Sequence, residues 1–168
     1  KKNFEPQDPV WRVGDTYNVS IGQGGVEVTP LQMTALTAIF ANGGRLYRPH
    51  LLDATLGIEG GVLEKRDPYL IREHMVSEES IREVAKGMRK TVTSGTARLL
   101  SGLPVAAAAK TGTAQAGSGL PHAWVTAFAP FDNPEIAITV MVEHAGEGST
   151  VAVPITNEIL RWYFTNRK

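Results

Sequence analysis

Alternating apolar residues in the last third of the chain predict β-strands. Residues 135–143 carry branched apolar side chains at every second position, and smaller or mixed side chains lie between them. Because successive side chains of a strand point to opposite faces, this pattern predicts a strand with two differently covered faces. Asp132, Asn133 and Pro134 supply a turn before it. A second strand is predicted over residues 123–129. The two faces of the clearer strand are Ile136, Ile138, Val140 and Val142 on one side and Ala137, Thr139 and Met141 on the other.

Two helices are predicted from capping residues and helical spacing. The first is framed by Thr29 as N-cap, Pro30 at the first helical position and the Gly43–Gly44 pair after its end. The second covers residues 77–93, has two glutamates in its first turn, where the helix dipole favours acids, and ends at Ser94–Gly95. Their expected apolar sides are Leu31, Ala35, Ala38 and Ile39 in the first helix, and Ile81, Val84, Ala85, Met88 and Val92 in the second.

A third helix is predicted to start near residues 151–153, because Pro154 is tolerated only in a first turn. Its expected apolar side comprises Ile155, Ile159, Trp162 and Tyr163, and its end frays over residues 165–168. The upstream part is less regular. Residues 19–21 and 26–28 predict extended chain around a glycine turn, and residues 45–56 and 62–64 predict short strand pairs.

Composition narrows the possible function classes. Lysine plus arginine equals aspartate plus glutamate at 17 each, and no basic run stands out, so a nucleic-acid partner has no support. No apolar run approaches the ~20 residues of a membrane span. The absence of cysteine excludes disulfides and thiolate metal sites. The four histidines, His50, His74, His122 and His144, show no metal-ligand spacing, so we expect neither a metal nor an organic cofactor.

The most informative segment is Lys-Thr-Gly-Thr-Ala-Gln at residues 110–115. Lys110 supplies a fixed positive charge, and Thr111 and Thr113 supply hydroxyls that can donate to a carboxylate. Gly112 has no side chain and lets the backbone of a ligand approach closely. A P-loop would need glycine before the lysine, and aspartyl-phosphate ATPases would need aspartate there; Ala109 excludes both. The hexapeptide therefore predicts a strand that binds an acyl substrate.

Longer blocks of the chain support a family resemblance. The hexapeptide resembles the third motif of penicillin-binding proteins and serine β-lactamases. The segments at residues 14–44, 122–130 and 141–155 resemble the transpeptidase domain of class B penicillin-binding proteins, and most of all the elongation-type group usually called penicillin-binding protein 2. Four alanines at 106–109 would favour helix, so the full range expected for this strand, residues 105–116, rests on the resemblance.

Two motifs of that family are missing from the sequence. None of the seven serines is followed by lysine three residues later or by asparagine two residues later, so neither Ser-x-x-Lys nor Ser-x-Asn is present. In the family both motifs lie upstream of the block that starts this chain. We therefore expect residues 1–168 to form the C-terminal portion of a single, incomplete transpeptidase domain. The resemblance implies an α+β fold, with an antiparallel sheet flanked by helices and without the nucleophile-bearing part.

The resemblance implies serine-type D,D-transpeptidase activity for the parent protein and none for this chain alone. The Thr113 N–H would complete an oxyanion hole, and the hydroxyls of Thr111 and Thr113 would meet the substrate carboxylate. Lys110 would belong to the catalytic hydrogen-bond network, Gly112 would admit the substrate backbone, and Gln115 would lie near the cleft. His122 would lie near the same cleft.

The implied ligands are the peptidoglycan stem peptide and β-lactam antibiotics. The implied partners are a SEDS-family glycosyltransferase and other elongation-complex proteins. The parent would be anchored by an upstream helix and would act at the outer face of the cytoplasmic membrane. Two alternatives remain at this point: a non-catalytic fragment or scaffold of the same fold, and a relative of the serine β-lactamases or β-lactam sensors.

Overall fold

A three-stranded antiparallel sheet forms the centre of the computed structural model, which describes residues 6–115, 117 and 119–167. The strand order is β5–β6–β7, with bounds of Ala108–Ala114, His122–Ala129 and Ile136–Val142. The three predicted strands are therefore confirmed. The first begins three residues later than predicted, and residue 116 of its predicted range lies outside the described residues.

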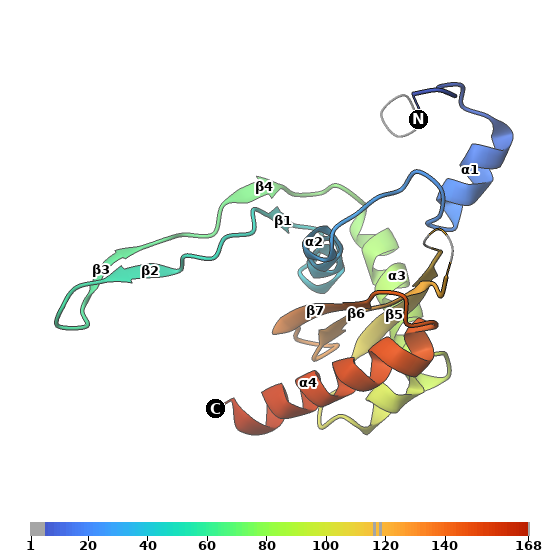
Figure 1. The fold of residues 1–168 in the computed structure, drawn as a ribbon. Coiled ribbons are helices and arrows are strands. Elements are labelled where there is room, and N and C mark those ends of the chain that lie inside the picture. Colours follow the sequence, from blue (N-terminus) through green and yellow to red (C-terminus); the bar gives the residue numbers. More distant parts are fainter. Residues whose placement is uncertain (1–5, 116, 118, 168) are drawn as a thin grey trace.

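Helices cover both faces of this sheet (Figure 1). Helix α4 (Val153–Asn166) lies on one face, whereas α2 (Pro30–Ala41) and α3 (Glu78–Thr93) lie on the other. The predicted alternation in β7 is confirmed, because its even-numbered residues pack with α4 and Ala137 packs with α2 and α3. The largest fully buried apolar side chains are Phe128, Leu100, Leu160, Val92, Val125 and Val153.

The N-cap predicted for α2 is confirmed, and α3 begins within one residue of its predicted start. The Thr29 hydroxyl accepts a hydrogen bond from the Gln32 N–H at 3.2 Å, and the Gln32 side chain accepts from the Thr29 N–H at 2.8 Å. Ser77 caps α3 by accepting from the Ser80 N–H at 3.2 Å. The apolar side of α3 is correct for Ile81, Met88 and Val92, which are buried, but Val84 is exposed. In α2, Ile39 is buried as expected, whereas Leu31 is exposed, contrary to expectation.

Helix α2 is joined to the sheet by threonine hydroxyls. Thr37 is almost fully buried and bonds both the Met33 carbonyl of its own helix, at 2.8 Å, and the hydroxyl of Thr126 on β6. The Thr126 hydroxyl lies 3.1 Å from that of Thr139 on β7. Buried hydroxyls need such partners, because leaving one unpaired costs roughly 1–3 kcal/mol. The network fixes α2 on the sheet and explains why a threonine occupies its buried side.

The predicted apolar side of the C-terminal helix is wrong. Val153, Thr156 and Leu160 are buried in α4, whereas Ile155, Ile159 and Trp162 are exposed. The helix has two apolar stripes, and its rotation is set by the π-helical turn η2 (Gly148–Ala152) that leads into it and packs on the sheet. The first-turn position of Pro154 is confirmed, and the helix continues to Asn166 rather than fraying at Thr165.

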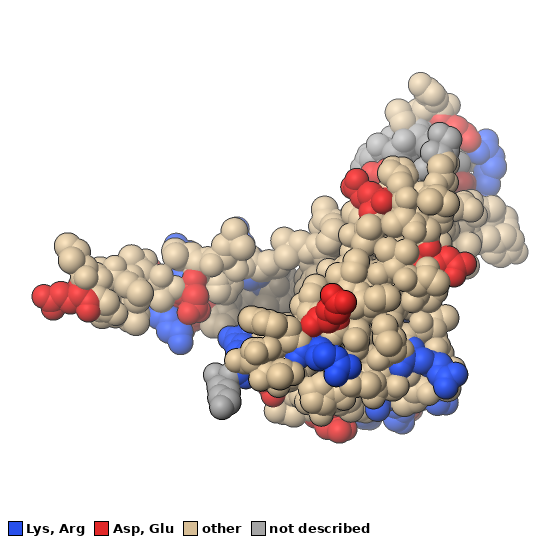
Figure 2. All heavy atoms as spheres, turned by 60° about the horizontal axis from the view of Figure 1, so that its bottom comes forward, with Lys and Arg blue, Asp and Glu red and all other residues tan. Residues whose placement is uncertain are grey.

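A long two-stranded arm, residues 46–72, projects from this body (Figures 1 and 2). It consists of β1 (Leu46–Tyr47) paired with β4 (Leu70–Arg72), and β2 (Ala54–Leu56) paired with β3 (Val62–Lys65). The expected short strand pairs are confirmed, although β4 was not predicted. Most of the large apolar side chains of the arm are exposed: Leu51, Leu52, Leu56, Ile58, Val62, Leu63, Tyr69, Leu70 and Ile71.

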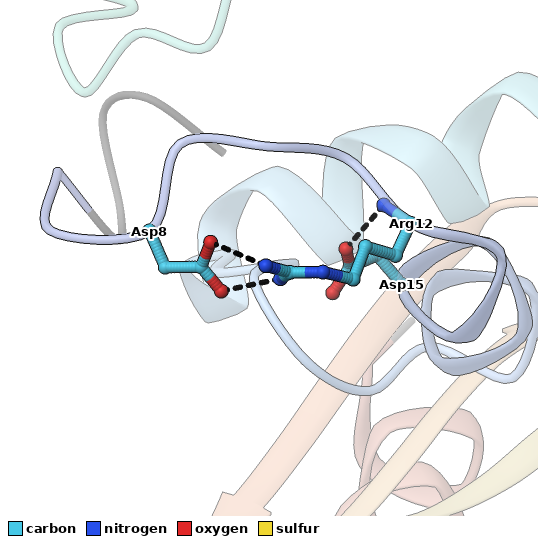
Figure 3. A network of polar contacts seen from close by, with 3 residues as sticks. All are labelled: Asp8, Arg12 and Asp15. Atoms are coloured by element: carbon cyan, nitrogen blue, oxygen red, sulfur yellow. Dashed lines mark hydrogen bonds and ion pairs between the residues drawn. The ribbon is translucent and has the colours of Figure 1, made fainter.

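The chain before the body contains a helix, α1 (Val13–Ser20), where residues 19–21 were predicted to be extended. The Asp15 carboxylate accepts from the Arg12 N–H at 2.7 Å at the start of this helix, and the Arg12 guanidinium pairs with both carboxylate oxygens of Asp8 (Figure 3). These local polar contacts favour helix although α1 buries no side chain. Among the described residues, no helix combines the length and apolarity needed to cross a membrane.

Candidate functional site

Strand β5 places residues 110–113 at an edge of the sheet. Its neighbour is β6, with Lys110 opposite Thr126 and Thr113 opposite Ala123, and in the described part of the chain no strand pairs with its other edge. Lys110 and Thr113 are exposed, and Thr111 and Gly112 are partly buried. An unpaired edge presents backbone N–H and C=O groups to a ligand that adds as a further strand.

Two side chains contact the carbonyls of this strand. The Lys110 ammonium donates to the Thr111 carbonyl, and the Gln23 side-chain amide donates to the Thr113 carbonyl at 3.2 Å. The N–H and C=O of one strand residue point to the same side. The Thr113 N–H is therefore directed towards the same edge as the carbonyl that Gln23 contacts.

Gly112 is packed from two directions. A Cβ added at Gly112 would lie 3.3 Å from the Trp124 Cβ on β6, which is tighter than ordinary contact. On the helix α4 side, Gly148 of η2 lies against the same cross-strand pair: a Cβ at Gly148 would be 2.2 Å from the Trp124 carbonyl oxygen and 2.5 Å from that of Gly112. Glycine at both positions lets two backbone segments touch, so the motif strand has a fixed support behind it.

Thr111 is contacted by a residue outside the motif. Its hydroxyl oxygen lies 2.6 Å from that of Thr96, in the turn between α3 and the 3₁₀ helix η1 (Arg98–Gly102). Sequence reasoning assigned no role to Thr96, Gln23 or Gly148. The glycines around Gln23 were a visible turn signal, but nothing in the sequence shows which distant strand such a turn contacts.

The remaining predicted residues lie at the end of this strand. Gln115 follows β5 directly and is exposed. His122, at the start of β6, lies opposite Ala114, and its Nδ1 accepts from the His144 N–H at 3.0 Å. His144 Nδ1 lies 3.2 Å from the Leu120 carbonyl oxygen, which can only accept, so this nitrogen is the donor. The histidine pair thus closes the end of the β6–β7 pairing, and the structure gives it this structural role.

The described serines show no sign of an activated nucleophile. Each makes a hydrogen bond with a group at most four residues away in the chain. None of these bonds involves a lysine or histidine side chain, which an activated serine would need. Ser118 lies outside the described residues. Among those described, no group of three or more His, Asp or Glu side chains is placed to hold a metal ion. The geometry therefore supplies a binding edge and hydroxyl donors.

Comparison with known proteins gives consistent matches. A family model described as the penicillin binding protein transpeptidase domain matches residues 3–161. The peptidoglycan D,D-transpeptidase MrdA of Haemophilus influenzae is 39% identical over 94% of this chain and 27% of the relative. The chain spans about a quarter of the length of the curated relatives it matches.

The solved structures that align with this chain include penicillin-binding proteins, in agreement with the family match. Penicillin-binding protein A from Mycobacterium tuberculosis, in its ceftriaxone acyl-enzyme complex, aligns with a TM-score of 0.81 and 31% identity, covering 90% of this chain and 36% of that one. Penicillin-binding protein 2 of Helicobacter pylori, in complex with MreC, aligns with a TM-score of 0.76 and 32% identity, covering 100% of this chain and 30% of that one.

Proposed function

Because this chain belongs to the penicillin-binding protein transpeptidase family, we propose that it supplies the substrate-binding strand of a peptidoglycan D,D-transpeptidase. The observation that carries the proposal is the unpaired edge of β5, where Lys-Thr-Gly-Thr presents a positive charge, two hydroxyls and the Thr113 backbone. This set matches what an acyl substrate with a terminal carboxylate requires: donors for its carboxylate and N–H groups for the oxygen of its reacting carbonyl.

The chemistry we propose for the parent is acyl transfer through a serine ester. A serine supplied by the parent attacks the penultimate D-Ala carbonyl of a stem peptide and releases the terminal D-Ala, and an amine of a neighbouring stem then takes the acyl group. The Thr113 N–H stabilises the oxyanion of each tetrahedral intermediate. Loss of one such donor costs roughly 2.7–4 kcal/mol in other acyl-transfer enzymes.

The remaining motif residues bind and orient the substrate in this proposal. The hydroxyls of Thr111 and Thr113 donate to the terminal carboxylate, and Lys110 biases the site towards anions and joins the catalytic hydrogen-bond network. Gly112 admits the substrate backbone. Gln115, exposed directly after β5, is positioned to contact the substrate beyond the end of the strand.

We extend the proposal to the partners and location of the parent. The ligands are the peptidoglycan stem peptide and β-lactams, since the M. tuberculosis relative is described as a ceftriaxone acyl-enzyme. The H. pylori relative is described in complex with MreC, which supports an elongation-complex partner of that kind. We propose in addition a SEDS-family glycosyltransferase partner and a site of action at the outer face of the cytoplasmic membrane, with an anchor upstream of the residues described.

Labelling with a fluorescent penicillin tests the proposal. We expect the parent protein to be labelled covalently and this chain alone to remain unlabelled, because its seven serines include no Ser-x-x-Lys. Mass mapping of the labelled parent should place the adduct upstream of residue 1. A stable adduct on a serine of this chain would overturn the proposal that the nucleophile lies outside these residues. A folded parent that remains unlabelled would overturn the proposed activity.

A further inference from the structure

The hydroxyl of Thr111 has a partner from another part of the fold. Thr96 Oγ1 lies 2.6 Å from Thr111 Oγ1, close enough for a strong hydrogen bond between hydroxyls. Thr96 is exposed, and Thr111 is partly buried. The contact joins the turn after α3 to β5, at the residue expected to meet the substrate carboxylate.

The turn that carries Thr96 is fixed on both sides. A Cβ added at Gly95 would lie only 2.8 Å from the Thr91 Cα, so glycine is needed for this close turn. Ala97 is fully buried, and its N–H donates to the Thr91 carbonyl at 3.0 Å. Since both neighbours of Thr96 are held in place, little conformational freedom is lost when its hydroxyl bonds Thr111.

The direction of the hydrogen bond between the two hydroxyls decides whether Thr111 can donate to a ligand. A threonine hydroxyl has one proton to donate and two lone pairs to accept with. If Thr111 donated to Thr96, it would have no proton left for an anionic ligand. If Thr96 donates to Thr111 instead, the Thr111 proton is free, and accepting a bond makes Thr111 a stronger donor.

We propose that Thr96 is a positioning residue for substrate binding: it donates to Thr111 Oγ1 and so directs the Thr111 proton to the substrate carboxylate. The inference rests on the function proposed above, in which Thr111 meets that carboxylate. The Lys110 ammonium, which donates to the Thr111 carbonyl, places a positive charge beside the pair and favours an anionic acceptor.

A double-mutant cycle in the full parent protein tests this role. Second-order rates of acylation by benzylpenicillin are measured for Thr96→Val, Thr111→Val and the double variant. We expect Thr111→Val to acylate about tenfold more slowly or worse, and Thr96→Val roughly three- to tenfold more slowly, as for loss of one neutral hydrogen bond. The double variant should be no slower than Thr111→Val, because Thr96 acts only through Thr111.

Three further measurements separate positioning from a general structural effect. Thr96→Ser keeps the hydroxyl and should restore the parental rate. Penicillin methyl ester masks the carboxylate, and its slower acylation should be the same in the parent and in Thr96→Val. Thr93→Val is the matched control, because Thr93 is an exposed threonine at the end of α3 whose hydroxyl bonds the Lys90 carbonyl at 3.4 Å; it should acylate at the parental rate.

The possible failures are distinguishable. Additive effects of Thr96→Val and Thr111→Val, or equal slowing with the methyl ester, would show that Thr96 does not act through Thr111 on the carboxylate and would overturn the inference. Parental rates for Thr111→Val would remove the carboxylate role of Thr111 itself, and with it this part of the proposed function.

Discussion

The body and the arm of this molecule contain similar apolar residues, which are buried in the body and exposed in the arm. Val125 in β6 is 1% exposed, whereas Val62 in β3 is 63% exposed; Leu160 of α4 is 0% exposed and Leu63 is 72% exposed. Both regions form antiparallel pairs, but only the body has helices on both faces. Backbone pairing is therefore enough to form a strand, and a second and third layer are needed to fix its side chains.

This difference explains where the candidate site lies. The motif strand β5 has α3 on one side and η2 on the other, so the positions of Thr111 and Thr113 are set by buried neighbours. In the arm, all residues of β3 and β4 are exposed, so no covering layer of this kind holds them. A binding edge that must hold donors in a fixed geometry belongs in the layered part of the molecule.

The largest effect is expected for matched glycine substitutions. Gly148→Val in the parent should prevent the body from folding, because even a Cβ there would lie 2.2 Å from the Trp124 carbonyl oxygen. Gly61→Val in the arm should be tolerated, since a Cβ at Gly61 meets nothing within 4 Å. Soluble yield and thermal unfolding of both variants check the contrast. A normally folded Gly148→Val would mean that η2 does not pack on β5 and β6 as described.

Removing a large apolar side chain should give the next largest contrast. Leu160→Ala should lower the free energy of unfolding by about 2–5 kcal/mol, because it leaves a cavity between α4 and the sheet. Leu63→Ala in β3 should change it by no more than about 0.5 kcal/mol. Urea unfolding of the two variants measures both values. Equal losses would mean that the arm is covered in solution by another part of the protein.

A threonine pair sharpens the comparison at the level of function. Thr113→Val in the parent keeps the backbone N–H but removes the hydroxyl proposed to meet the substrate carboxylate. A hydrogen bond to a charged group is worth about 1.5–3 kcal/mol, so acylation by β-lactams should fall by roughly ten- to hundredfold. Thr55→Val, at an exposed position of β2, should leave the rate unchanged. Stopped-flow acylation rates of the two variants test this contrast, and thermal melts exclude unfolding. A parental rate for Thr113→Val would argue against β5 as the substrate-binding strand.

The smallest effect is expected for an exposed ion pair on α3. A hydrogen bond from Lys86, 2.6 Å from Glu83, together with the lysine charge, lowers the pKa of the Glu83 carboxyl. A carboxyl with a lower pKa in the folded state adds stability above its unfolded pKa, and this gain is lost as the pH falls through the folded pKa. Because the pair is exposed, Glu83→Gln should change unfolding at neutral pH only at the limit of measurement, and less still in acid or high salt. Urea unfolding of both proteins, measured from neutral pH down to acid, checks this expectation. A large change in stability at neutral pH would contradict it.

Local signals predicted part of the fold well. The Thr29 cap and the glutamates in the first turn of α3 are signals that depend on residues within a few positions. The first of these helices begins directly after the predicted cap, and the second begins within one residue of its predicted start. The family expected from the blocks around the motif is also confirmed. In contrast, α1 depends on the particular contact between Arg12 and Asp15, which no apolar pattern indicates. The buried side of α4 is set by the η2 turn before it rather than by the helix itself.

The candidate site was predictable only as far as it is contiguous. Lys110 to Thr113 form one segment, so their chemistry can be read from the sequence. Gln23 and Thr96 approach the same strand from 90 and 15 residues away, and their contacts depend on the tertiary arrangement. Gly148 has a role only because two backbone segments meet there. Such residues become visible when distances are known.

The contact between Gly148 and the backbone of Gly112 and Trp124 gives the motif strand a preferred direction of displacement. With carbonyl oxygens already so close to Gly148, any shift of β5 towards η2 meets steep repulsion. A shift away from η2 meets no such barrier from this contact. The glycine pair thus acts as a steric stop on one face of β5, so the strand cannot yield towards η2 when a ligand is attached at this edge.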